Sequence, residues 1–117
     1  LDGSGLSRYN YITPEALVRV LEHVRLNSQS ATIFEATLPI AGQDGTLAHR
    51  LKGTNATGNA RAKTGTMSNV SGLSGFVQTR DGENLVFAIL ANNYKSRSST
   101  ITRIIDRAVE QLADFAR

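Results

Sequence analysis

The sequence reads Ala62-Lys63-Thr64-Gly65-Thr66-Met67-Ser68 and, shortly after, Gly72-Leu73-Ser74-Gly75-Phe76. These two stretches decide the fold, because they predict neighbouring strands over 60–66 and 73–79. Arg80-Asp81-Gly82-Glu83 is a hairpin turn signal, and the apolar run over 85–91 predicts a third strand. Because this run is apolar at every position, we expect both faces of the third strand to be covered.

A helix is expected ahead of these strands. Thr13 can cap it, Pro14 suits its first position, and apolar residues at helical spacing predict a helix over 13–26. A shorter helix is expected over 31–38, and one helical turn near 47–51.

The final helix is predicted over 99–116, with Ser98 or Ser99 as its cap. Its apolar residues recur on one side, so it can cover one face of the sheet. The helix over 13–26 is too short to cover the other face alone. The fold class is therefore α/β, an antiparallel sheet of at least three strands flanked by helices. Part of the covering layer is expected on sequence outside this chain.

Composition excludes several classes of protein. The chain has 117 residues, enough for one domain or a piece of one, and we expect it to begin inside a longer product because it starts with Leu1. The absence of cysteine excludes disulfides and a cysteine nucleophile. His23 and His49 lack metal-binding spacing, so neither a metal nor another cofactor is expected. The net charge of +3 is dispersed along the chain, which argues against a nucleic-acid partner.

The Lys-Thr-Gly sequence suits the binding of an anionic ligand along a strand. Lys63 places a positive charge beside a carboxylate, and the hydroxyls of Thr64 and Thr66 can donate to it. Gly65 keeps the strand surface clear for a ligand backbone. An outward N–H on the same strand can serve as an oxyanion donor. The alternative interpretation is an exposed lysine at a polar strand end.

The segment Asp2-Gly3-Ser4-Gly5-Leu6-Ser7-Arg8 is rich in glycine and serine, which is typical of a linker or turn. It is not a nucleophile elbow, because glycines flank Ser4 directly instead of lying two residues away on either side.

Taken together, the chain resembles the low-molecular-mass penicillin-binding proteins, in the group of D-alanyl-D-alanine carboxypeptidases/endopeptidases with large inserted domains. The matching residues are 2–10, 62–68 and 72–76, and the order strand, strand, long helix after Lys-Thr-Gly also fits. The resemblance implies that residues 1–117 are the C-terminal part of a single penicillin-binding domain with a β-lactamase-like transpeptidase fold. The remainder of that domain would lie upstream.

The resemblance also implies roles for the matching residues. Lys63 would lie beside the catalytic serine and help to hold the terminal carboxylate of the substrate. Thr64 and Thr66 would offer hydroxyls to that carboxylate, next to Gly65 in the same substrate-binding strand. The backbone N–H of Thr66 would form half of the oxyanion hole.

A pocket for the acyl side of the substrate is implied as well. Its wall would be formed by Ser4, Gly5 and Leu6. The substrate side chain before the scissile bond would face Arg8, Met67 and Ser68, and Arg8 suits a side chain with a free carboxylate. The implied ligands are peptidoglycan stem peptides and β-lactams, in the periplasm or another extracytoplasmic compartment of a bacterium.

Two motifs of this family are absent. No serine has a lysine three residues later, and neither a serine nor a tyrosine has an asparagine two residues later. Ser7 and Asn10 are one residue too far apart to substitute for the second motif. The nucleophile, its lysine base and the Ser-x-Asn pair are therefore expected on an upstream segment or chain, which would be this chain's partner.

Two other functions stay open. A serine β-lactamase shares Lys-Thr-Gly, although the segment over 2–7 argues against it. A non-catalytic cell-wall binding or scaffolding module would keep the fold without the chemistry.

Overall fold

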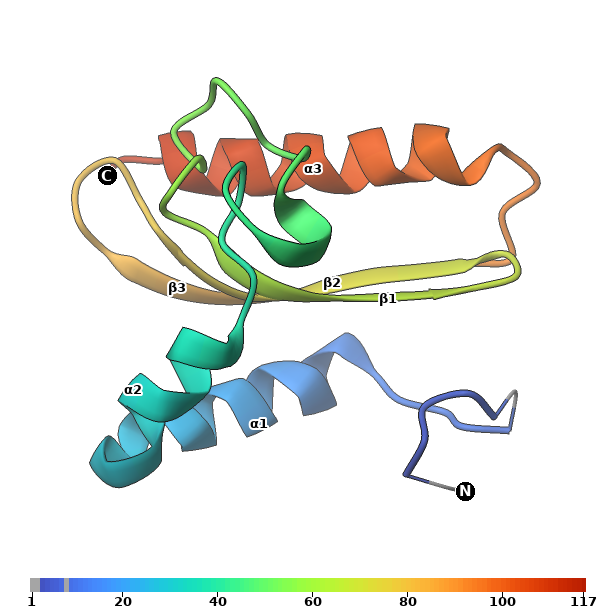
Figure 1. Cartoon of the computed structure of the whole chain (residues 1–117), viewed down its shortest axis with the longest axis horizontal. Coiled ribbons are helices and arrows are strands. Elements are labelled where there is room, and N and C mark those ends of the chain that lie inside the picture. The colour runs from blue at the N-terminus through green and yellow to red at the C-terminus, as the bar shows by residue number, and fades with distance from the viewer. Residues whose placement is uncertain (1–2, 8) are drawn as a thin grey trace.

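The computed structural model describes residues 3–7 and 9–117. Within them lies an antiparallel sheet of three strands in the order β1-β2-β3 (Figure 1). The strands are β1 (Arg61–Met67), β2 (Val70–Gln78) and β3 (Asn84–Asn92). The three predicted strands and the predicted fold class are thus confirmed.

Strand β2 begins at Val70, earlier than the sequence predicts. The connection from β1 contains only Ser68 and Asn69, and Asn69 adopts the left-handed conformation (φ 58°) that tight hairpins require. The next turn is the predicted one at residues 80–83. The Thr79 amide donates to the Glu83 carbonyl oxygen at 2.8 Å across that turn.

Helix α3 (Ser98–Asp114) covers one face of the sheet (Figure 1). The main core lies between them, and its largest buried side chains include Leu73, Val77, Phe87, Ile105 and Val109. The expected cap is wrong: Arg97 occupies the N-cap position and makes no side-chain capping hydrogen bond. Because the helix starts at Ser98, both Ser98 and Ser99 lie within its first turn.

Helices α1 (Pro14–Leu26) and α2 (Ser28–Thr37) lie on the opposite face (Figure 1). Thr13 caps α1 as predicted, because its hydroxyl accepts a hydrogen bond from the Ala16 amide at 3.1 Å. Leu21 of α1 packs with Leu38 and Phe76 in a second, smaller core. Helix α2 begins three residues before its predicted start at 31. None of the described helices combines the length and apolarity required to cross a membrane.

Strand β3 is less covered than its apolar sequence predicts. Phe87 is buried, but the other apolar side chains over 85–91 are only partly buried. A groove of about 760 Å³ runs beside this strand. It is lined by Val18, residues 85–89, Ala108, Gln111, Leu112 and Phe115. The two layers of helices therefore leave part of the surface of β3 open.

The loop between α2 and β1 is anchored at both of its ends. An isolated bridge pairs Ile40 with Arg61 at the start of β1. A short 3₁₀ helix, η1 (Gly45–Leu47), lies slightly before the predicted turn near 47–51, and Leu47 is fully buried. Farther along, the Arg50 guanidinium forms an ion pair with Asp106 of α3 at 2.6 Å, with both side chains largely buried. The loop is thus fixed against both the sheet and α3.

The pairing of β1 with β2 requires a glycine at position 75. Gly75 lies opposite Ala62. A Cβ atom there would lie 2.1 Å from the Arg61 carbonyl oxygen and 2.6 Å from the Ala62 Cα atom. Both are backbone atoms, which cannot move without separating the strands.

We predict that Gly75→Ala lowers the free energy of unfolding by about 1–3 kcal/mol, the usual range for overpacking. Gly65→Ala is the matched control, because a Cβ at Gly65 meets no atom within 4 Å. Thermal unfolding of the two purified variants measures the difference. Equal melting temperatures for both would contradict this account of the strand pairing.

Candidate active site

The outer edge of β1, on the side away from β2, carries the polar groups of the Lys-Thr-Gly motif. The Ala62 amide donates to the Pro39 carbonyl oxygen at 3.1 Å on that side. Since backbone groups alternate in direction along a strand, the N–H groups of Thr64 and Thr66 point to the same edge. This edge therefore offers backbone donors to a ligand lying alongside it.

Lys63 places a positive charge at the same edge. Ala62 is buried in the core beneath α3, so alternation puts the Lys63 side chain on the opposite face of the sheet. The ammonium then reaches back to donate to the Thr64 carbonyl oxygen at 2.5 Å. Within the described part of the chain, no carboxylate forms an ion pair with Lys63. Its charge is thus available to an anionic ligand.

A cavity of about 500 Å³ joins the two sequence motifs. The end of β1 contributes Gly65, Thr66 and Met67. The segment before α1 contributes Gly5, Ser7, Asn10, Tyr11 and Ile12, and the neighbouring strands add Val70, Gly72 and Leu90. Residues some sixty positions apart in the sequence therefore line one cavity, with apolar groups forming much of its surface.

The other predicted site residues that the structure describes lie outside this lining. Leu6 is 74% exposed and does not line the cavity. The Ser4 hydroxyl accepts a hydrogen bond from the Leu6 amide at 3.2 Å, within a local turn. Ser68 is exposed in the β1–β2 turn, and Arg8 lies outside the described residues. Of the predicted pocket residues that the structure describes, only Gly5 and Met67 line the cavity.

Three polar residues near the site were not predicted as part of it. Ser7 and Asn10 line the cavity; both belong to the matching stretch 2–10, but the family resemblance implied no role for them in the site. The Thr46 hydroxyl of η1 accepts a hydrogen bond from the Thr64 hydroxyl at 3.2 Å. Thr46 lies 18 positions before Thr64 in an irregular loop. Neither spacing nor periodicity could have indicated this contact.

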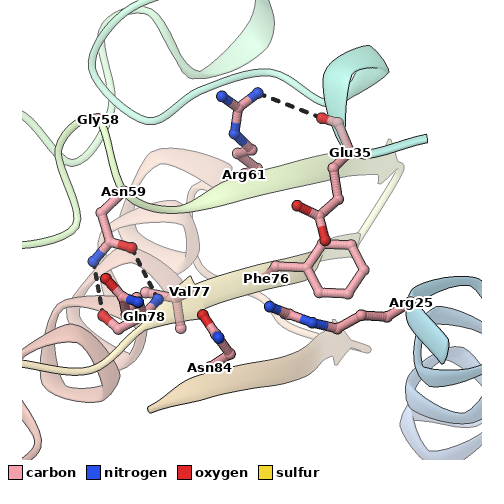
Figure 2. Close-up of a pocket in the computed structure, with 9 residues that line it drawn as sticks. All are labelled: Arg25, Glu35, Gly58, Asn59, Arg61, Phe76, Val77, Gln78 and Asn84. Atoms are coloured by element: carbon pink, nitrogen blue, oxygen red, sulfur yellow. Dashed lines mark hydrogen bonds between the residues drawn. The ribbon is translucent and has the colours of Figure 1, made fainter. Parts of the chain in front are cut away.

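A second cavity, of about 350 Å³, lies at the opposite end of the sheet (Figure 2). The Asn59 side chain binds the backbone of Gln78 there, donating to its carbonyl oxygen and accepting from its amide, both at 2.8 Å. The Arg25 guanidinium lies over the Phe76 ring at 5.2 Å from its centroid. These contacts join the loop before β1 to the end of β2 and α1 to the sheet. None of the predicted site residues that the structure describes lines this cavity. We interpret it as a structural junction.

The sequence profile of the D-Ala-D-Ala carboxypeptidase 3 (S13) family matches residues 1–113. The chain belongs to this peptidase family. It is 40% identical over 98% of its length to the penicillin-sensitive carboxypeptidase A of Dictyostelium discoideum. It is 41% identical, also over 98% of its length, to the D-alanyl-D-alanine carboxypeptidase of Actinomadura sp. strain R39. It covers 23% and 22% of these two relatives.

The fold agrees with this assignment. Penicillin-binding protein 4 of Haemophilus influenzae, solved with a β-lactam, matches 97% of the chain with a TM-score of 0.87 at 32% identity. The chain covers 28% of that structure. The chain therefore spans about a quarter of the length of these relatives. The resemblance to penicillin-binding proteins is confirmed at the level of family and fold.

Proposed function

We propose that this chain is the C-terminal part of the penicillin-binding domain of a serine D-alanyl-D-alanine carboxypeptidase/endopeptidase, and that it supplies the substrate-binding strand. The observation that carries the proposal is the free edge of β1. There the Lys63 ammonium and the outward amides of Thr64 and Thr66 lie beside a cavity shared with the segment before α1. A cation and aligned backbone donors at one edge suit an extended peptide that ends in a carboxylate.

In this proposal the stem peptide of peptidoglycan binds along β1. Lys63 and the Thr64 and Thr66 hydroxyls hold its terminal carboxylate, and Gly65 leaves room for its backbone. The serine Oγ on the upstream segment attacks the carbonyl carbon of the penultimate D-alanine. The oxygen that becomes negative accepts a hydrogen bond from the Thr66 N–H, which supplies half of the oxyanion hole.

The acyl-enzyme then forms and breaks down in two balanced steps. As the carbonyl is restored, the C–N bond breaks and the amine of the terminal residue leaves with the proton that the serine gave up. Water next attacks the ester, releases the shortened peptide as a carboxylic acid, and returns the proton to the serine. This chain contributes charge and positioning to both steps, and no bond to it is made or broken.

The cavity beside β1 is the proposed pocket for the acyl side of the substrate. Gly5 and Met67 line it, which supports that role for them. We extend the role to the predicted neighbours Ser4, Leu6, Arg8 and Ser68. A free carboxylate on the substrate side chain would bind Arg8, as the family resemblance implies.

The upstream segment is the proposed partner of this chain. The chain contains neither Ser-x-x-Lys nor Ser-x-Asn. It also leaves the apolar residues of β3 only partly covered, beside a groove of about 760 Å³. An upstream part that fills this groove would complete the sheet and its covering layer. In this proposal the same part also carries the nucleophile, which lies beside Lys63 at the β1 edge of the sheet.

β-Lactams are the second proposed class of ligand. They carry a carboxylate and a reactive carbonyl, so the same cation and oxyanion donor suit them. The name of the Dictyostelium relative and the β-lactam bound to the Haemophilus protein support this assignment. Because these ligands and peptidoglycan occur outside the cytoplasm, we place the complete protein in the periplasm or an equivalent compartment.

We predict that Lys63→Ala in the complete protein slows acylation by benzylpenicillin by about 30- to 1000-fold, as loss of an electrostatic contact in a confined site costs ~2–4 kcal/mol. Lys52→Ala, at an exposed lysine in the preceding loop, is the control and should keep the wild-type rate. A Lys63→Ala rate within about threefold of wild type would remove the role we assign to this residue. Rapid release of the acyl group would instead indicate a β-lactamase.

In the proposed complex, the ligand backbone occupies the space beside β1 at Gly65. Gly65→Ala adds a methyl group that meets no atom within 4 Å and projects from a residue lining the cavity. We expect the melting temperature to stay close to that of wild type, while acylation slows about tenfold or more through obstruction of the bound ligand. Stopped-flow acylation and thermal unfolding measure the two effects. Unchanged acylation would show that the ligand does not lie along this edge.

A further inference from the structure

We propose that Thr46 is a positioning residue for the substrate carboxylate and closes the binding edge of β1 together with Thr64. The inference rests on the proposed function and extends it to a residue outside the Lys-Thr-Gly strand. Its starting point is the 3.2 Å hydrogen bond from the Thr64 hydroxyl to the Thr46 hydroxyl.

Hydrogen bonds within residues 40–47 hold the turn that carries Thr46. The Ile40 amide donates to the Asp44 carboxylate at 2.6 Å, and the Gly42 amide donates to the Leu47 carbonyl oxygen at 2.9 Å. Leu47 is fully buried, whereas Thr46, the residue before it, is exposed. The turn therefore holds one exposed hydroxyl at a defined place.

The same turn is also fixed to its surroundings. Gly45 has a φ of 52°, and a Cβ there would lie 3.1 Å from the Pro39 ring, so the turn packs closely on the residue that pairs with β1. The Arg50–Asp106 ion pair joins the following residues to α3. A hydroxyl carried by so constrained a turn loses little conformational entropy when it binds a ligand.

The free length of the β1 edge limits how many substrate residues can bind there. At Ala62 the edge is occupied by the Pro39 carbonyl, and at Thr64 the Thr46 hydroxyl contacts the strand. Thr66, the proposed oxyanion donor, lies two residues farther, or ~6.6 Å along the strand. This length suits one amino-acid residue and its carboxylate. The Thr46–Thr64 pair thus stands where the α-carboxylate of the residue after the scissile bond would lie.

The pair of threonine hydroxyls has one proton left to donate in a hydrogen bond to that carboxylate. Each hydroxyl has a single proton, and Thr64 uses its own on Thr46. The proton of Thr46 then remains for the anion, and the chain from Thr64 through Thr46 to the carboxylate polarises each member. If the anion takes the Thr64 proton instead, Thr46 reverses and donates to Thr64. Either arrangement requires a hydroxyl at position 46.

The test compares acylation of the complete protein by benzylpenicillin and by its methyl ester, which lacks the carboxylate. Thr46→Val should slow acylation by benzylpenicillin about tenfold, mainly through weaker initial binding, and leave the rate with the ester unchanged. Thr46→Ser keeps the hydroxyl and should stay within about twofold of wild type with both. Thr32→Val, at an exposed threonine of α2, is the control for an unrelated substitution.

A Thr46→Val protein that reacts with benzylpenicillin at the wild-type rate would overturn the inference while the proposed function stands. An equal loss with acid and ester would also overturn it, because a purely structural defect does not distinguish the two ligands. A wild-type protein that reacts with neither compound would overturn the proposed function together with the inference.

Discussion

The hydrogen bond from the Ala62 amide to the Pro39 carbonyl sets the direction of every amide in β1. Because the Ala62 amide points away from β2, the amides of Thr64 and Thr66 also point away from it. The amides of the residues between them point toward β2. The same alternation buries Ala62 under α3 and sends Lys63 to the opposite face. A shift of one residue would turn the Thr64 and Thr66 amides toward β2 and move the Lys63 side chain to the face beneath α3. The register is in turn held by Gly75, which lets the two strands approach closely opposite Ala62.

The chain has two kinds of edge, and their contrast supports the idea of a composite site. The edge of β1 is polar, and it is bounded at one end by a constrained turn. The other outer strand, β3, is apolar at successive positions and borders a large groove. A polar edge with outward donors is suited to a ligand, whereas a strand with apolar side chains on both faces is suited to further protein. In the proposed function, the Ser-x-x-Lys and Ser-x-Asn motifs would belong to the same part of the protein that would cover β3.

Local sequence patterns predicted the strands and the long helix well, because hydrophobic periodicity and turn residues act over short distances. They were less informative where tertiary contacts determine the start or end of an element. The start of β2 depends on the compact turn at Asn69, and the cap expected at Ser98 or Ser99 failed because α3 begins at Ser98 itself. For the candidate site, Lys63, Gly65 and Thr66 were identifiable from one short motif. The contact of Thr46 with Thr64, and the places of Ser7 and Asn10 in the cavity, arise only when distant segments fold together.

The most direct test of a composite site locates the acylated serine. The complete protein, with a protease site introduced just before Leu1, is labelled with a fluorescent penicillin, cleaved at that site and separated on a denaturing gel. All of the label should follow the upstream fragment, and the fragment that begins at Leu1 should stay dark. Label on the fragment that begins at Leu1 would place the nucleophile in that fragment and would contradict the idea of a composite site. The absence of label from both fragments would contradict it as well.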